Sequence, residues 1–141
     1  MDTTIKWYLA GPMTGHPQFN YPLFYEVAEK LRSEGFDITS PAEMDDPTTV
    51  AAALASPDGS AEDYASDGKG TWGEFLARDV RMIADDLGGI ILLPEWYTSK
   101  GARLEAFVSM NCGYPTMIYT QDGLGEVVND YVLEKINESL L

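Results

Sequence analysis

Cysteine is nearly absent from this chain. Cys112 is the only cysteine among 141 residues, which excludes an internal disulfide and any metal site built from several cysteines. No apolar run approaches the roughly 20 residues that a membrane span needs. Residues 1–5 also lack the basic and apolar segments of a signal peptide. We therefore expect a protein of the cytoplasm that has no membrane partner.

Basic residues are also scarce. Lys and Arg number 9 against 23 Asp and Glu, and the formal net charge is -14. A nucleic-acid polymer is bound through clustered basic side chains, so this balance argues against such a partner but not against a single nucleotide. The acidic residues show no recognisable metal-ligand spacing, and we expect neither a metal ion nor another cofactor.

Apolar residues are plentiful and regularly spaced. They make up 45% of the chain, a normal share for a globular protein, and the length favours a single domain over residues 1–141. Strands are predicted at residues 5–10, 36–40, 89–93 and 116–119, and helices at 21–34, 72–86, 102–112 and 126–141. This alternation predicts a three-layer α/β sandwich, with helices on both faces of a four- to five-stranded parallel sheet in the flavodoxin-like or Rossmann-like order 2-1-3-4.

Residues 45–71 differ from the rest of the chain in composition. Ala, Asp, Gly and Ser dominate this segment, and only residues 49–55 favour a short helix. Long polar segments in compact domains are usually disordered or act as lids. We interpret residues 45–71 as a flexible insertion, with a slight preference for a mobile flap beside the site.

The strand at 89–93 and the helix after it organise the chain. In an open α/β sheet, ligands bind where strands end and the following helices begin. Glu105 is expected in the first turn of this helix, where the helix dipole favours an ionised carboxylate, and such a carboxylate is a candidate nucleophile. Ser99 can offer a hydroxyl and a backbone N–H to an anion at the same helix end. Without further context, an ordinary first-turn acid is the favoured interpretation of Glu105.

The first predicted strand runs into a glycine-containing turn that begins at Gly11 and Pro12. Glycine lets the backbone approach a ligand closely, although a plain turn is the simpler interpretation. The G-x-G-x-x-G spacing of a dinucleotide site is absent. Asn20 is predicted to be the N-cap of the helix that follows.

Asp79 falls inside the apolar stripe of the helix at 72–86. Burying a carboxylate is costly unless it is paired or bound. One interpretation is an ion pair with Arg78 or Arg103, and the spacing alone favours it. The other is an acid that lines a pocket, has a raised pKa and delivers a proton.

Taken together, these motifs resemble a known superfamily. They are the segment Tyr8 to Pro12, the pair Arg78-Asp79, the strand at 89–93, and Ser99 and Gly101 followed by Glu105. Their order and spacing resemble the nucleoside 2-deoxyribosyltransferase superfamily, which includes deoxynucleoside 5′-monophosphate N-glycosidases and a small branch common in bacteriophages. The phage branch is the most similar in the sequence of these motifs. For a phage protein the expected compartment is the host cytoplasm.

The resemblance implies a role for each matching residue. Glu105 matches the nucleophile that attacks the anomeric carbon of a 2-deoxyribosyl group, and Tyr8 matches the tyrosine whose hydroxyl holds that carboxylate. Asp79 matches the acid near the leaving base. Gly11 and Pro12 match the turn that borders the sugar.

Position 99 separates two groups within the superfamily. Transferases that act on free nucleosides carry an acid there, whereas the monophosphate glycosidases carry a serine that faces the 5′-phosphate. A hydroxyl at a helix N-terminus attracts phosphate, so Ser99 favours a nucleotide substrate. Asn20 and Gly101 are further expected substrate-binding residues, and Trp96 is either a packing residue or a platform on which a base stacks.

The predicted function is N-glycosidic bond hydrolysis or base exchange on a (deoxy)nucleoside 5′-monophosphate, through a covalent glycosyl-enzyme intermediate. One alternative is a non-catalytic module that binds, senses or sequesters a nucleotide. Another is a glycosidase that acts on a signalling nucleotide. The resemblance also implies a homodimer or a larger homo-oligomer.

Overall fold

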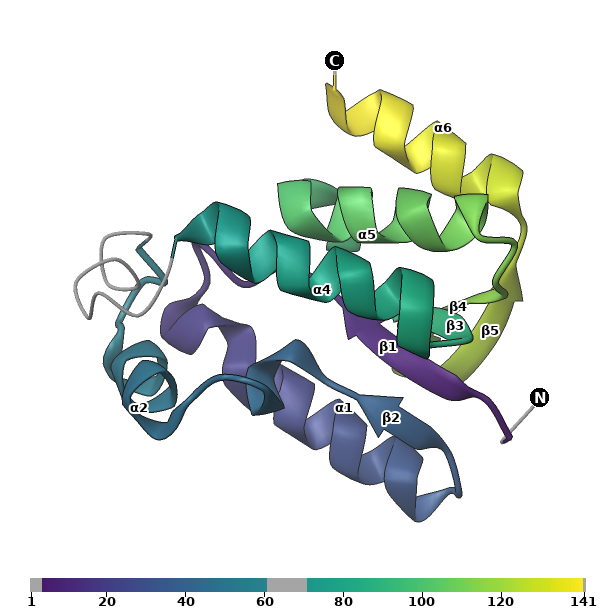
Figure 1. The fold of residues 1–141 in the computed structure, drawn as a ribbon. Coiled ribbons are helices and arrows are strands. Elements are labelled where there is room, and N and C mark those ends of the chain that lie inside the picture. The colour runs from purple at the N-terminus through teal and green to yellow at the C-terminus, as the bar shows by residue number, and fades with distance from the viewer. Residues whose placement is uncertain (1–3, 61–70, 141) are drawn as a thin grey trace.

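A central sheet separates two layers of helices (Figure 1). The computed structural model describes residues 4–60 and 71–140. The sheet order is β2-β1-β3-β4-β5, with strands β1 (Lys6–Ala10), β2 (Asp37–Thr39), β3 (Gly89–Leu92), β4 (Thr116–Thr120) and β5 (Gly123–Val127). The first four strands are parallel, which confirms the predicted α/β sandwich and the predicted order of those strands.

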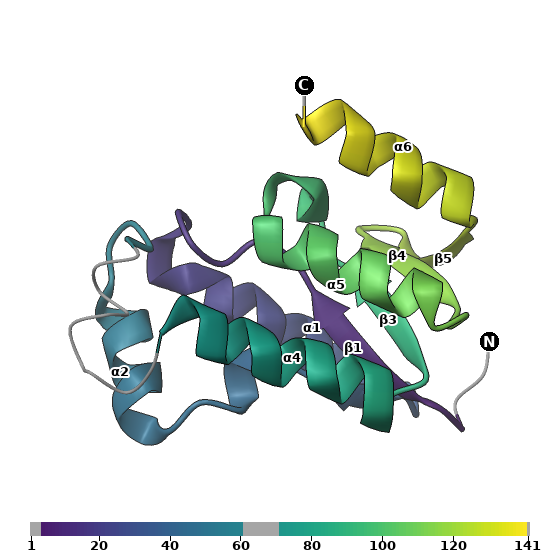
Figure 2. The same ribbon diagram turned by 45° about the horizontal axis from the view of Figure 1, so that its top comes forward.

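Helices cover both faces of this sheet. They are α1 (Tyr21–Ser33), α2 (Pro47–Ala55), α4 (Trp72–Asp86), α5 (Lys100–Asn111) and α6 (Asn129–Leu140). Figure 2 shows α4 and α5 side by side over β1 and β3, with α1 on the opposite face. Within residues 4–60 and 71–140, no helix is both long enough and apolar enough to cross a bilayer.

Only part of the predicted insertion falls within the described residues. The short helix expected at residues 49–55 is present as α2, which Asp46 caps by accepting a hydrogen bond from the Thr49 backbone N–H at 2.8 Å. Residues 61–70 lie outside the described part of the chain. The flexible flap at 45–71 therefore stays a prediction.

The C-terminal part of the fold differs from the prediction. The sequence analysis started the last helix at residue 126. Instead, residues Gly123–Val127 form β5, which pairs antiparallel with β4, and α6 begins at Asn129. The glycines of this segment are typical of a turn rather than of a strand. The segment is a strand because β4 provides the partners for its backbone hydrogen bonds.

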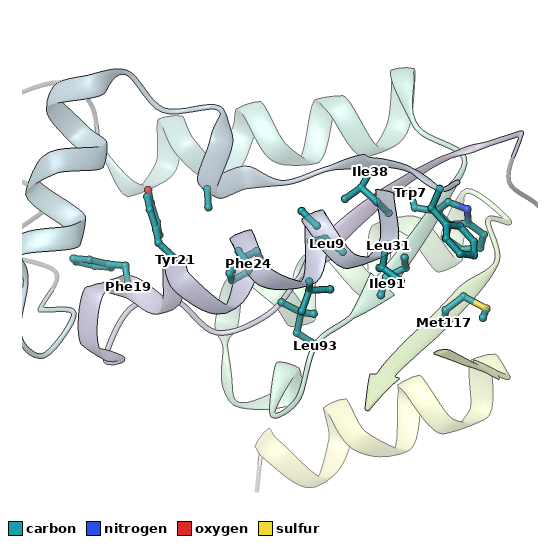
Figure 3. Close-up of a cluster of buried hydrophobic side chains, with 14 of the residues drawn as sticks. Trp7, Leu9, Phe19, Tyr21, Phe24, Leu31, Ile38, Ile91, Leu93 and Met117 are labelled. Carbon is teal, nitrogen blue, oxygen red and sulfur yellow. The ribbon is translucent and has the colours of Figure 1, made fainter. Parts of the chain in front are cut away.

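Alternate residues of β1 point to opposite faces of the sheet. Trp7 and Leu9 join Ile91 and Leu93 in the cluster under α1 (Figure 3). Tyr8 instead points to the other face, into the cluster formed with α4 and α5. The period of two along a strand thus brings the Tyr8 side chain to the side on which α5 carries Glu105.

The connection from β1 to α1 passes through a left-handed turn. Gln18, Phe19 and Asn20 have φ values of 56°, 52° and 61°, a region that non-glycine residues rarely adopt. The segment after α2 holds this turn, because the Gln18 backbone N–H donates to the Ser56 carbonyl at 2.9 Å. The turn places Asn20 and the start of α1 beside the end of β1.

A close backbone contact between Gly59 and His16 gives a test of this arrangement. A Cβ atom on Gly59 would lie 2.1 Å from the His16 carbonyl oxygen, and Gly59 has a φ of +69°. Gly15, whose N–H donates to the Gly59 carbonyl, has a φ of +88° and open space around its Cα. We expect Gly15→Ala to lower the free energy of unfolding by about 1–2 kcal/mol, and Gly59→Ala to lower it by at least twice as much.

Urea unfolding followed by circular dichroism measures both values. Gly15→Ala is the matched control, since it adds the same methyl group at a positive φ without the clash. Equal losses for the two variants would show that the contact between residues 16 and 59 is not close.

Candidate active site at the carboxyl edge of the sheet

A buried hydrogen bond joins β1 to α5. The Tyr8 hydroxyl donates to Glu105 Oε2 at 2.6 Å, and both residues are buried, with Tyr8 0% and Glu105 6% exposed. The expected contact between these two residues is therefore present. The bond lies beside the ends of β1 and β3. The order in which strands are added to the sheet reverses between these two strands, and this is the usual ligand position in such folds.

The sequence analysis expected Glu105 in the first turn of its helix, but the residue lies beyond that turn. The helix begins at Lys100 with Ser99 as its N-cap, and its first turn contains no acid. The helix dipole stabilises charge only near the first turn, so it gives Glu105 little support.

The surroundings of Glu105 also disfavour the ionised form that the sequence analysis expected. Burial, together with the negative charge of Asp79, raises the pKa of Glu105 to about 8, although the hydrogen bond from Tyr8 acts in the opposite direction. Desolvation disfavours the charged form of any carboxyl group. These surroundings favour the protonated form of the Glu105 carboxyl group at neutral pH.

Asp79 forms the expected ion pair with Arg78, and its pKa is also raised, while its delivery of a proton stays a prediction. Its Oδ1 accepts a hydrogen bond from Arg78 Nε at 2.9 Å, and its side chain is 13% exposed. Burial raises the pKa of Asp79, while the positive charge of Arg78 and a hydrogen bond from Tyr8 lower it. The acid is thus paired, and it lies half-buried beside Glu105.

The raised pKa of Glu105 favours one proton held between the two carboxyl groups of Glu105 and Asp79. A hydrogen bond to Asp79 contributes to the raised pKa of Glu105, and two carboxyl groups can hydrogen-bond only when one is protonated. Arg78 favours the negative charge on Asp79, which leaves the proton on Glu105. Burial and the Glu105 charge raise the pKa of Tyr8 well above 10, so its hydroxyl remains a donor.

Arg78 also contacts an acid that the sequence analysis did not select. Arg78 Nη1 donates to Asp45 Oδ1 at 2.8 Å, and the Asp45 side chain is 3% exposed. The Tyr21 hydroxyl, at the start of α1, donates to the other oxygen of Asp45. No spacing signal reveals this contact, because 33 residues separate Asp45 from Arg78.

The turn after β1 is fixed by packing and by Asn20. A Cβ atom on Gly11 would lie 2.8 Å from Leu93 Cβ, so the close approach of β1 and β3 alone requires a glycine there. Asn20 precedes α1 but does not cap it through its side chain, contrary to the prediction. Its Nδ2 instead donates to the Pro12 carbonyl at 2.9 Å, because the left-handed backbone of Asn20 turns the amide toward that loop. Substrate contacts of Gly11, Pro12 and Asn20 stay predictions.

Ser99 serves as the N-cap of α5. Its hydroxyl oxygen accepts a hydrogen bond from the Ala102 backbone N–H at 3.2 Å, and the residue is half-buried. A serine hydroxyl that accepts one bond still has a proton to donate. Gly101, also half-buried, lies in the first turn of the same helix, so both residues border its N-terminus.

Trp96 is a packing residue. It is 2% exposed, and its ring packs against the rings of Tyr97 and Tyr131 at centroid distances of 5.8 Å and 6.4 Å. The prediction that a base stacks on Trp96 is therefore wrong, because α6 brings Tyr131 against the ring. The loop after β3 looked exposed in the sequence, where this distant helix could not be placed.

Residues 5–118 match the model of a family described as Domain of unknown function (DUF4406). The chain belongs to this family. The DUF4406 match includes Tyr8, Asp79 and Glu105, and it ends before β5 and α6. No curated protein and no solved structure matches the chain. Because the family description assigns no function, the resemblance to nucleoside 2-deoxyribosyltransferases is not confirmed and stays a prediction.

Two further features of this DUF4406 domain concern metal binding and cavities. Among the described residues, no three His, Cys, Asp or Glu side chains are grouped closely enough to hold a metal ion. A groove of about 390 Å³ lies on the opposite side of the sheet from Glu105, between the end of α1 and the β4–β5 hairpin. It has no part in the cluster around Glu105.

The raised pKa of Glu105 predicts an unusual pH dependence of stability. The folded state holds the proton more tightly than the unfolded chain, whose ordinary value is 4.5, so this group lowers the free energy of unfolding as the pH rises from 4.5 to 8. Glutamine mimics the protonated acid and does not titrate. We expect Glu105→Gln to match the wild type near pH 5 and to exceed it at pH 8 by a difference on the order of a few kcal/mol.

Thermal unfolding of both proteins across this pH range measures the effect. The difference between the two melting temperatures, rather than either value alone, cancels the titration of the other acids. A difference that does not change with pH would mean that Glu105 is already ionised at neutral pH.

Proposed function

We propose that this protein cleaves or exchanges the N-glycosidic bond of a (deoxy)nucleoside 5′-monophosphate. The observation that carries the proposal is the cluster of buried Tyr8 and Glu105 with the half-buried Asp79, in which the Tyr8 hydroxyl lies 2.6 Å from Glu105 Oε2. Paired carboxyl groups are the machinery that glycosidic bond cleavage needs. The substrate class follows from the resemblance and from the hydroxyl of Ser99.

The reaction would proceed by double displacement. A Glu105 oxygen bonds to the anomeric carbon while the bond from that carbon to the base nitrogen breaks, and the electron pair leaves with the base. Asp79 gives its proton to the departing base. Water then attacks the anomeric carbon and displaces Glu105, and its proton passes to Asp79. Another base in place of water gives exchange instead of hydrolysis.

The shared proton fits this sequence of steps. At rest the proton lies on Glu105, where it would block nucleophilic attack. Transfer of this one proton to Asp79 ionises Glu105, which frees the nucleophile, and protonates Asp79, which prepares the general acid. Tyr8 can stabilise the Glu105 carboxylate through the hydrogen bond that it already donates. One proton on the pair is therefore the working state of the proposed enzyme.

The hydroxyl of Ser99 supports the choice of a phosphorylated substrate. It stands at the N-terminus of α5, where backbone N–H groups and the helix dipole attract an anion. An acid at this position would repel the phosphate. The proposal therefore places the 5′-phosphate near Ser99 and the anomeric carbon near Glu105.

Base release tests the proposal directly. Each deoxynucleoside 5′-monophosphate is incubated with the protein, and the free base is separated by liquid chromatography. We expect release from at least one of them, a loss of about 10²- to 10⁴-fold in Asp79→Asn, and a larger loss in Glu105→Gln. Asp86→Asn, an exposed position at the end of α4, is the charge-matched control and should keep full activity.

A second candidate function is nucleotide binding without catalysis. The near-complete burial of Glu105 and its proton at neutral pH favour it, because a protonated carboxyl group is a poor nucleophile. Nucleotide binding that survives Glu105→Gln, together with no base release from any monophosphate, would replace the first function with this one.

The pH dependence of the rate tests the shared proton. Above about pH 8 the pair loses its proton, the base can no longer be protonated as it leaves, and we expect the rate to fall. Initial rates from about pH 6 to about pH 10 measure this limb. A rate that rises to a plateau above pH 8 would show that the fully ionised pair is the active form.

A further inference from the structure

The contact between Arg78 and Asp79 is unusual for two neighbours on a helix. Consecutive side chains point about 100° apart around the helix axis, and such pairs do not normally face each other. Arg78 nevertheless donates from Nε to Asp79 Oδ1 at 2.9 Å. Something outside the helix must therefore hold the guanidinium against the Asp79 side chain.

Asp45 holds the other end of the guanidinium. Its Oδ1 accepts from Arg78 Nη1 at 2.8 Å, while the Tyr21 hydroxyl donates to its Oδ2. The side chain of Asp45 is 3% exposed and that of Arg78 is 32% exposed, so water reaches the ion pair only from the Arg78 side. Arg78 thus spans two acids that come from segments far apart in the chain, as the fork geometry of a guanidinium allows.

We propose that Asp45 is a positioning residue for Asp79. By anchoring Arg78 from the segment that follows β2, it keeps the positive charge beside Asp79 and keeps the shared proton of the Asp79–Glu105 pair easy to remove. This inference deepens the proposed function and rests on it in taking that pair as the reacting one. Asp45 itself does not touch the pair through any hydrogen bond that the structure shows.

The other charged and titratable groups around this cluster have partners of their own or stay neutral. On α1, burial and the charges of Glu43 and Asp45 raise the pKa of Tyr25, which therefore stays protonated. Glu43 pairs with Arg32 at 2.6 Å. On β1 and α5, Tyr8 and Glu105 face Asp79 and bond to each other. Among these groups, Arg78 is the cation that faces Asp79.

The variant Asp45→Asn separates this proposal from simple electrostatics. Removing a negative charge, with Arg78 still in place, would make the pair more acidic, because the charge of Asp45 raises the pKa of Asp79. Releasing Arg78 would do the opposite, because Asp79 loses its counter-charge. We expect the second effect to win, and the titration midpoint of Glu105 to move up by about one pH unit.

Carbon NMR of the side-chain carboxyl groups measures this midpoint without substrate. The Glu105 signal is assigned by its disappearance in Glu105→Gln. A midpoint in Asp45→Asn that stays in place or moves down would overturn the proposal. The control Asp86→Asn removes one charge from the exposed end of α4 and should leave the midpoint unchanged.

Arg78→Lys keeps the test decisive if Asp45→Asn does not fold. A lysine ammonium is a point charge on a flexible stem and cannot bridge both acids, so the midpoint should again move up. An unchanged midpoint in this variant would also overturn the proposal. The titration needs no turnover, so the two proposals can fail separately. Absence of base release in the wild type would refute the proposed function, while the NMR titration alone decides whether Asp45 positions Arg78.

Discussion

The hydrogen bond between Tyr8 and Glu105 is the contact on which the candidate site depends. It connects Tyr8 of β1, whose side chain faces α5, to an acid on that helix, across a region that excludes water. Burial decides the chemistry of both partners, since it keeps the proton on the phenol and raises the pKa of the carboxyl group. Neither group would behave in this way at the protein surface.

A chain of polar contacts extends this bond across the carboxyl edge of the sheet. It runs from Tyr8 and Glu105 through Asp79 and Arg78 to Asp45. Isolated buried charges are costly, but each charged member of this chain has a partner of opposite charge or a hydrogen-bond donor. The segment between β2 and α2 is thereby tied to the acids on α4 and α5. This connection explains how a residue far from Glu105 in the sequence can influence its proton.

Much of the fold could be read from the periodicity of apolar residues. The parallel strands and α4 follow strong local patterns, and the alternation of strands and helices leaves few arrangements of the sheet. The strand β5 escaped prediction because its glycines suggest a turn and its pairing partner is β4. For Trp96, base stacking stayed an alternative to packing because the sequence could not show that Tyr131 of α6 packs against it. Both errors concern contacts with the C-terminal part of the chain.

The sequence by itself indicated which residues form the candidate site: the motifs around Tyr8, Asp79 and Glu105 stand at strand ends and helix faces that local patterns define. Only the tertiary structure decided their charge states. The distance along the chain hides the neighbours of a carboxyl group, and its pKa depends on those neighbours and on burial rather than on its place in a helix. For the same reason, Asp45 became visible as a partner of Arg78 only when the segments that carry them were packed together.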